Sequence, residues 1–132
     1  MSVTRIAISL EPEVVEKLEE RMKNGIYLNR SKAISDILRD SFLREEVAKG
    51  KGMRVGTISL AYNHHLPGIQ DKITEVQHNF GLNVIASLHI HLSHEECLEV
   101  IAVKGNSDKL QKITDSIAAI RGVNSCKLLI VK

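Results

Sequence analysis

The first apolar pattern in the chain is an alternation close to the N-terminus. Ile6, Ile8 and Leu10 share one parity, and the residues between them are small or polar. This period of two predicts a short strand over residues 5–10. Because a lone strand leaves both edges unpaired, we expect it to pair antiparallel with the same strand of an identical subunit.

Two helical patterns follow this strand. Pro12 stands in the favoured first turn of a helix that carries apolar residues at helical spacing and stops at Asn24-Gly25. The run Asn29-Arg30-Ser31 then supplies capping residues for a second helix, whose apolar stripe extends to Phe42. The strand and the two helices define a predicted first domain over residues 1–48.

The second half of the chain begins after residues 49–52, Lys-Gly-Lys-Gly, which we interpret as a flexible, charged connector. Residues 53–132 form a predicted second domain in which strand and helix patterns alternate. The expected elements are strands over 53–63, 82–92, 97–104 and 122–131 and helices over 67–78 and 107–120. The order βαββαβ is that of a ferredoxin-like domain, so the expected fold class is α+β.

The strand expected over residues 82–92 has two unlike faces. Its even-numbered positions from Val84 to Leu92 are all apolar and are expected to face a buried core, whereas the opposite face presents His89 and His91. Side chains two positions apart on a strand lie about 7 Å apart at the base. Two imidazoles can therefore converge on one metal ion.

The remaining candidate ligands lie close by in the sequence. All six histidines fall between His64 and His94. A hairpin through the polar residues 93–96 brings Cys97 beside the histidine strand, and His78 can supply a fourth ligand within the chain or across a subunit interface. Imidazole and thiolate suit Zn, Cu, Fe or Ni and argue against Mg and Ca, but ligand types alone do not choose among the first four.

Composition limits the remaining possibilities. Aromatic residues make up 3% of the chain and Trp is absent, so small aliphatic cores are expected, and these favour oligomerisation. The sequence has no apolar run long enough to span a membrane and no signal-peptide pattern, so we expect a cytoplasmic protein with no membrane partner. Two cysteines fit a reducing compartment, and a net charge of +2 argues neither for nor against nucleic acid.

Three residue runs carry a family resemblance: Asn29-Arg30-Ser31-Lys32-Ala33-Ile34, Leu88-His89-Ile90-His91 and His94-Glu95-Glu96-Cys97-Leu98-Glu99. With the order of elements, they resemble the NikR family of nickel-responsive transcriptional regulators over nearly the whole chain. The resemblance implies a ribbon-helix-helix DNA-binding domain joined to an ACT-like domain, assembled as a homotetramer that is a dimer of dimers.

The same resemblance implies a square-planar Ni(II) site, one ion per subunit. At the matching positions, His89, His91 and Cys97 come from one subunit and His78 from its neighbour. Nickel binding is expected to regulate transcription, with repression of genes for nickel uptake or related functions as the expected outcome.

Contacts with DNA also follow from the resemblance. Paired N-terminal strands would enter the major groove of double-stranded operator DNA with two half-sites, so that Arg5, Ala7 and Ser9 face the bases. Ala7 offers only a methyl contact where the family often carries threonine. Asn29-Arg30-Ser31 begins the second helix, where exposed amides attract a backbone phosphate.

Other residues have supporting roles in this interpretation. Glu99 shares a strand face with Cys97, and with Tyr62 and His64 it is a candidate for holding a ligand imidazole in place. The family's secondary cation site uses an acidic pair on the second helix, whereas this chain has Lys32 and Asp36. Since an ammonium group has no lone pair for a cation, Lys32 is expected to pair with Asp36 in place of the ion.

Two other classes of function fit parts of this pattern. A metal buffer or chaperone would use the same ligands but would not need Arg5 on an alternating strand or a capped helix pair, and a related regulator could respond to another metal. An enzyme with Cys97 as nucleophile and a nearby histidine as base is the third class. The sequence shows no complete catalytic triad, so we expect no enzymatic activity.

Overall fold

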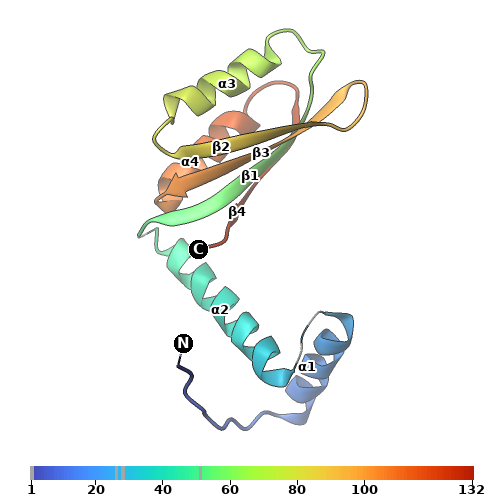
Figure 1. The fold of residues 1–132 in the computed structure, drawn as a ribbon, viewed down its shortest axis with the longest axis vertical. Helices are drawn as coiled ribbons and strands as arrows, with labels where there is room; N and C mark the ends of the chain where they lie inside the picture. Colours follow the sequence, from blue (N-terminus) through green and yellow to red (C-terminus); the bar gives the residue numbers. More distant parts are fainter. Residues whose placement is uncertain (1, 26, 28, 51) are drawn as a thin grey trace. The chain divides into compact units, whose positions relative to one another are not determined.

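The computed structural model describes residues 2–25, 27, 29–50 and 52–132, and the chain divides into two compact units, Met1–Phe42 and Leu43–Lys132. The expected connector 49–52 includes residue 51, which lies outside the described residues. None of the helices in the described part of the chain combines the length and the hydropathy that a membrane span needs. The two units are described separately below (Figure 1).

The N-terminal unit contains helix α1 (Pro12–Asn24) and the start of helix α2 (Arg30–Ala48). Leu18 and Ala33 are its buried apolar residues. Asn29 caps α2 as expected, because its Oδ1 accepts a hydrogen bond from the backbone N–H of Lys32 at 2.8 Å. The unit is therefore helical, with a small core.

The strand expected over residues 5–10 is not found in this single chain. Residues 2–11 form neither helix nor strand, and Ile6 and Ile8 are exposed. A strand is held by hydrogen bonds to a neighbouring strand. One chain supplies only one copy of the segment, so its expected partner is missing here.

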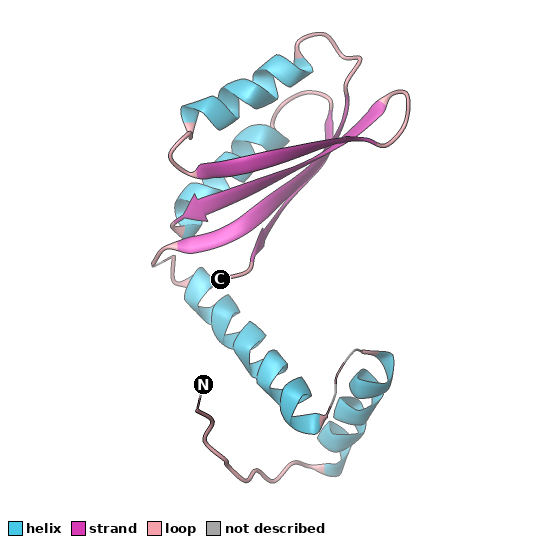
Figure 2. Ribbon diagram, in the orientation of Figure 1, coloured by secondary structure: helices cyan, strands magenta, loops and turns pink. Residues whose placement is uncertain are grey.

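The C-terminal unit has the expected βαββαβ order. Its elements are β1 (Arg54–Asn63), α3 (Ile69–Asn79), β2 (Val84–His91), β3 (Glu96–Gly105), α4 (Ser107–Ala118) and β4 (Val123–Ile130). The strands form one antiparallel sheet in the order β2-β3-β1-β4, with α3 and α4 packed on it (Figure 2). The ferredoxin-like α+β prediction is confirmed for this unit.

Both helices bury their apolar residues against the same face of the sheet. Ile73 of α3 and Ile113 of α4 share a core cluster with Leu60 of β1 and Ile101 of β3. Alternation places every second residue of β1 and β3 on this covered face. Tyr62, at the end of β1, belongs to the same cluster and is almost fully buried.

The prediction that the even-numbered residues of β2 face this core is wrong beyond Val84. Leu88 is 59% exposed and Ile90 is 39% exposed. They lie opposite Val100 and Leu98 on the sheet face that neither α3 nor α4 covers. The histidine face of β2 is instead the one that continues the helix-covered side of β3, so the sequence pattern identified an apolar face but not what covers it.

Candidate metal centre

The candidate metal centre is built on the hairpin of β2 and β3. His91 lies directly opposite Cys97, and His89 lies opposite Glu99. The turn between the strands is held by the hydroxyl of Ser93, which accepts a hydrogen bond from the backbone N–H of Glu96 at 3.1 Å. The prediction that the hairpin brings Cys97 beside the histidine strand is confirmed.

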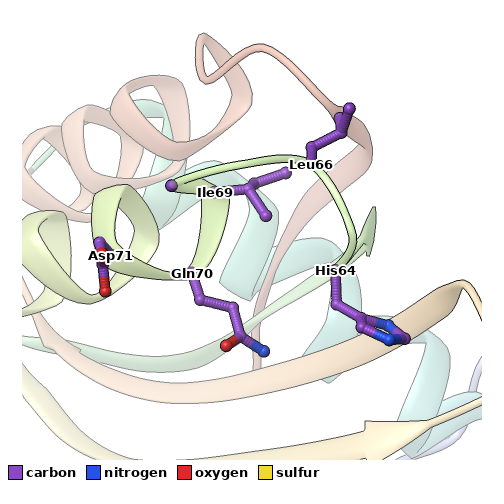
Figure 3. Close-up of a pocket in the computed structure, with 6 residues that line it drawn as sticks. His64, Leu66, Ile69, Gln70 and Asp71 are labelled. Carbon is purple, nitrogen blue, oxygen red and sulfur yellow. The ribbon is translucent and has the colours of Figure 1, made fainter.

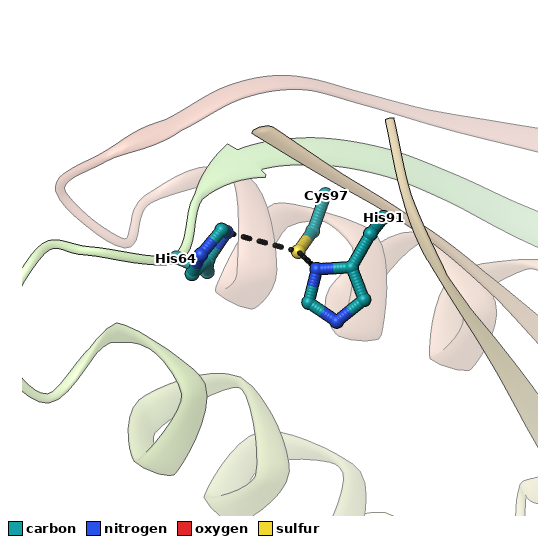
Figure 4. A group of neighbouring side chains, drawn as sticks. All are labelled: His64, His91 and Cys97. Carbon is teal, nitrogen blue, oxygen red and sulfur yellow. Dashed lines mark hydrogen bonds between the residues drawn. The ribbon is translucent and has the colours of Figure 1, made fainter. Parts of the chain in front are cut away.

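A second pairing brings a third ligand atom to the same place. The end of β1 lies beside the start of β3, with Asn63 opposite Glu96, so that the next residue, His64, reaches Cys97. Nδ1 of His64 lies 3.3 Å from Sγ of Cys97, and Nδ1 of His91 lies 3.5 Å from the same sulfur (Figure 4). Sequence reasoning had given His64 only a supporting role.

These three side chains form the group of potential metal ligands found among the described residues. The ligand atoms of His64, His91 and Cys97 all lie within 4.8 Å of one another. Cys97 is buried, His64 is half-buried and His91 is exposed, so the three side chains extend from the core to the surface. Thiolate with imidazole fits a borderline or soft ion such as Ni, Cu or Zn better than Mg or Ca.

The surroundings of Cys97 and His64 favour the uncharged form of each side chain. Burial, together with the nearby charge of Glu99, raises the pKa of the Cys97 thiol. Burial and the neighbouring imidazoles lower the pKa of His64. A cation that binds here meets a His64 side chain that favours its neutral form, and it must displace the proton of Cys97.

A hydrogen-bonded network of Tyr62, Glu99 and Gln77 lies beside the cluster. The hydroxyl of Tyr62 lies 3.1 Å from Nε2 of His89 and 3.4 Å from Oε1 of Glu99. The side-chain amide of Gln77, on α3, donates to Oε2 of the same carboxylate. Burial and the charge of Glu99 raise the pKa of Tyr62 to about 12, so its hydroxyl keeps its proton and can donate.

The predicted ligands are thus only partly brought together within one chain. His91 and Cys97 meet, whereas His89 contacts Tyr62 and stacks beside His91 at a ring-centroid distance of 5.5 Å. His78 is an exposed residue of the last turn of α3 and is not a member of the three-residue group. The four-ligand set that includes His78 and His89 stays a prediction.

Two further histidines extend the cluster outward. The ring centroid of His65 lies 4.3 Å from that of His64 and 5.1 Å from that of His94. His65 and His94 are both exposed, whereas His64 is half-buried. The imidazoles therefore continue from the surface to the buried sulfur of Cys97.

A small pocket lies between His64 and the start of α3. Figure 3 shows the side chains of His64 and Gln70 at its border. Gly68, whose positive φ of 78° suits glycine, turns the chain into α3 at this point. The residues that line the pocket are His64, Leu66, Gly68, Ile69, Gln70 and Asp71.

The predicted DNA-contacting residues lie at the surface of the N-terminal unit. Arg5, Ala7 and Ser9 are exposed in the segment without secondary structure. The run Asn29-Arg30-Ser31 begins α2, and the guanidinium of Arg30 forms an ion pair with Glu19 of α1. The expected pair on α2 is confirmed, since Nζ of Lys32 lies 2.8 Å from Oδ1 of Asp36.

The comparison with protein-family models and the comparison with curated proteins agree with each other. The family model described as the NikR C-terminal nickel-binding domain matches residues 55–131. A protein of Methanocaldococcus jannaschii named as a nickel-responsive regulator is 38% identical over 128 residues, covering 96% of this chain and 91% of its own length. One from Trichlorobacter lovleyi with the same name is 36% identical, covering 97% and 92%.

Solved structures match the C-terminal fold. The ACT domain from GTP pyrophosphokinase of Chlorobium tepidum has a TM-score of 0.53 and 19% identity, covering 59% of this chain and 100% of that one. An uncharacterized protein from Thermotoga maritima has a TM-score of 0.56 and 16% identity, covering 61% and 100%. At these identities the similarity concerns the fold, which is ACT-like.

Proposed function

Since the chain belongs to the NikR family of nickel-responsive transcriptional regulators, we propose that Ni(II) held at the Cys97 centre raises the affinity of the N-terminal unit for operator DNA. The observation that carries this proposal is the buried thiol of Cys97 with His91 beside it on the hairpin. The family is regulatory and not enzymatic, and its C-terminal domain binds nickel.

We assign four ligands to one nickel ion per subunit. His89, His91 and Cys97 of one subunit lie on a single hairpin, and His78 of a neighbouring subunit completes the set. The exposed position of His78 on α3 supports this assignment, because an exposed imidazole is available to a second chain. A bound nickel ion would supply a fixed centre of charge that joins the two subunits.

The Gln77 and Glu99 hydrogen bond connects this ligand set to α3 inside one chain. Gln77 directly precedes His78, and Glu99 lies opposite His89. The carboxylate therefore fixes α3 with one oxygen and the Tyr62 hydroxyl with the other, and that hydroxyl contacts His89. This network couples the ordering of the ligands to the ordering of α3. Nickel binding therefore shifts the assembly toward conformations in which α3 is ordered.

We assign residues 1–48 to a ribbon-helix-helix domain, residues 49–52 to its connector and residues 53–132 to the regulatory domain. In this assignment residues 5–10 of two copies pair into a ribbon that enters the major groove. Arg5 and Ser9 can hydrogen-bond base edges, and Ala7 offers a methyl group. Exposed apolar residues Ile6 and Ile8 support pairing, because they would be covered by the partner copy.

The start of α2 is assigned to the DNA backbone. Asn29 already caps the helix, which leaves the adjacent backbone amides and the dipole directed outward. Arg30 is paired with Glu19 in the free chain and is 65% exposed, so a phosphate can compete for its guanidinium. Ser31 is exposed beside it and adds a hydroxyl donor.

We also propose a homotetramer formed as a dimer of dimers. The sheet face opposite α3 and α4 carries the partly exposed side chains of Leu88, Ile90, Leu98 and Val100. Burial of such a face against another copy is favourable by about 25 cal/mol for each Å² of apolar surface. A tetramer presents two ribbon domains, which match the two half-sites of the operator DNA. We expect its binding to repress nickel-uptake or related genes.

Subunit mixing tests the shared nickel site directly. His78→Ala and Cys97→Ala are each expected to abolish tight nickel binding as pure proteins. After the two variants are mixed and allowed to exchange subunits, some sites combine an intact His78 with an intact Cys97, so nickel binding and its thiolate charge-transfer absorption should return in part. No recovery, with subunit exchange verified by mass spectrometry, would contradict a site shared between subunits.

A further inference from the structure

We propose that His64, His91 and Cys97 form a second metal site, closed within one subunit, that binds a tetrahedral thiophilic cation such as Zn(II) and competes with nickel for His91 and Cys97. The regulatory consequence of this site rests on the proposed function. The existence of the site does not, because all three ligands belong to one chain.

The three donors are fixed by the sheet and require no second copy. Cys97 is on β3, His91 is the last residue of β2, and His64 follows β1. The backbone N–H of His64 also donates to the carbonyl of Glu95 at 3.0 Å, which ties the residue to the β2–β3 turn. The cluster is therefore already assembled in the single chain (Figure 4).

The separations between donors fit a zinc-sized ion. With Zn–S near 2.3 Å and Zn–N near 2.05 Å, an S–N edge is about 3.5 Å at tetrahedral angles and about 3.1 Å at square-planar angles. The sulfur of Cys97 lies 3.3 Å from the nitrogen of His64 and 3.5 Å from that of His91. The ligand atoms of His64 and His91 lie within 4.8 Å of each other, so one ion can reach all three donors.

The fourth position can be filled without another protein ligand. His91 is exposed, so the cluster borders the surface, where water is available as a ligand. Three protein ligands and one water are a common arrangement for zinc sites that keep an open position. His89 stays with Tyr62 in this arrangement, since their 3.1 Å contact does not involve the three donors.

The two ligand sets exclude each other because they share a nitrogen and a sulfur. When His89 and the neighbouring subunit's His78 replace His64 as ligands, a site closed within one chain becomes a site that joins two chains. An ion that prefers tetrahedral geometry is satisfied by the first set and makes no contact with α3 of the neighbour. His64 thereby acts as a metal-selectivity residue, because it retains zinc in a form that does not order the subunit interface.

The test compares His64→Ala with two matched variants in the full-length protein. His65→Ala removes the adjacent exposed imidazole, which is outside the three-residue group, and His78→Ala removes the proposed cross-subunit ligand. Zn(II) affinity is measured by competition with a chromophoric chelator, and Co(II) serves as a spectroscopic probe of tetrahedral thiolate ligation. Circular dichroism verifies that each variant is folded, and His64→Gln provides a second replacement of similar polarity.

We expect His64→Ala and His64→Gln to weaken Zn(II) binding by about 10- to 100-fold or more, since even partners of ligands have effects of that size. His65→Ala and His78→Ala should keep both Zn(II) affinity and the tetrahedral Co(II) spectrum. Unchanged Zn(II) affinity in both His64 variants, or loss in His78→Ala alone, would overturn the proposal.

A nickel titration of the same proteins separates this proposal from the proposed function. His64→Ala should keep the square-planar Ni(II) spectrum, because His64 is not one of the four assigned nickel ligands, and Zn(II)-loaded wild-type protein should gain less operator affinity than the Ni(II) form. Failure of wild-type protein to bind DNA in response to nickel would contradict the proposed function, while the effect of His64 on zinc would still stand. Loss of nickel binding in His64→Ala would instead make His64 a nickel ligand and overturn the competing-site proposal.

Discussion

Gln77, the residue before His78 on α3, donates a hydrogen bond to the buried carboxylate of Glu99 on β3. The two residues are far apart in the sequence, and their contact joins the helix that carries one proposed ligand to the strand that carries another. Glu99 also lies within 3.4 Å of the Tyr62 hydroxyl, which contacts His89. A shift of the hairpin formed by β2 and β3 is therefore transmitted to α3 through these hydrogen bonds.

Gln77→Ala should weaken both the fold and the nickel response. It leaves one oxygen of a buried carboxylate without its partner, which costs about 1–3 kcal/mol in the free energy of unfolding. Nickel affinity should fall by about 10- to 100-fold because a group that holds the ligands is lost. Denaturant melts and nickel titrations measure the two effects.

Gln111→Ala is the matched control for that variant. Gln111 donates to Asp115 on the exposed side of α4, so its loss should change stability by only about 0.2–0.5 kcal/mol and leave nickel affinity unchanged. Equal effects of the two glutamine variants on nickel would show that the Gln77 and Glu99 contact has no special role.

Cys97→Ala should remove tight nickel binding and leave the fold intact. Its thiol is the sulfur that His91 approaches, and the substitution removes only one atom from the core. Cys126→Ala is the control, since Cys126 is a free, partly buried residue whose thiol contacts the carbonyl of Thr114. Isothermal titration should show binding in Cys126→Ala only; tight nickel binding by folded Cys97→Ala would exclude Cys97 as a ligand.

Nickel affinity should rise with pH. Burial raises the pKa of Cys97, so the free protein holds a proton on this sulfur at neutral pH, and metal binding must release it. Below the thiol pKa the affinity should increase by about tenfold for each pH unit from this group alone. The lowered pKa of His64 means that this imidazole stays neutral to more acid pH, so it adds no pH dependence near neutrality.

Calorimetric titrations in buffers of different ionisation enthalpy measure this proton release. About one proton per nickel ion should come from Cys97 at neutral pH. A binding enthalpy independent of the buffer would mean that the thiol is not deprotonated on binding.

The pair of Lys32 and Asp36 should make operator binding insensitive to the type of added cation. The ammonium lies 2.8 Å from the carboxylate, where the family resemblance implies an acidic pair and a bound cation. Lys32→Glu restores two carboxylates four residues apart on α2, so its operator affinity should depend on whether K⁺, Na⁺ or Ca²⁺ is present at constant ionic strength. Lys32→Ala lacks the second carboxylate and should show no such selectivity; cation selectivity in the wild type would contradict a replacement by Lys32.

The local parts of the site could be predicted from the sequence, but the long-range parts could not. The short polar turn before Cys97 fixes which strand it meets, so its proximity to His91 followed from chain connectivity. The contact of His64 with Cys97 depends on the pairing of β1 with β3, whose residues lie far apart in the sequence. One available signal was the ferredoxin-like topology itself, because it places the end of β1 beside the start of β3.

The partner that covers an apolar face was harder to predict than the face itself. Leu88 and Ile90 have the alternation of a buried face, yet the two helices of the unit cover the opposite face. Ile6 and Ile8 likewise alternate as in a strand, although a single chain offers them no pairing partner. In both segments the periodicity indicates an apolar surface but does not indicate what covers it.

The most direct test of nickel-dependent regulation is operator affinity at fixed salt, measured with Ni(II), Zn(II), Cu(II) and no metal on a DNA fragment with two half-sites. Arg5→Ala, which should bind nickel normally but lose operator affinity, reports whether the N-terminal segment makes the contact. We predict tight binding with Ni(II), accompanied by a square-planar thiolate spectrum, and weak binding without metal. Nickel bound at the Cys97 centre with no change in affinity for a validated operator would contradict the account.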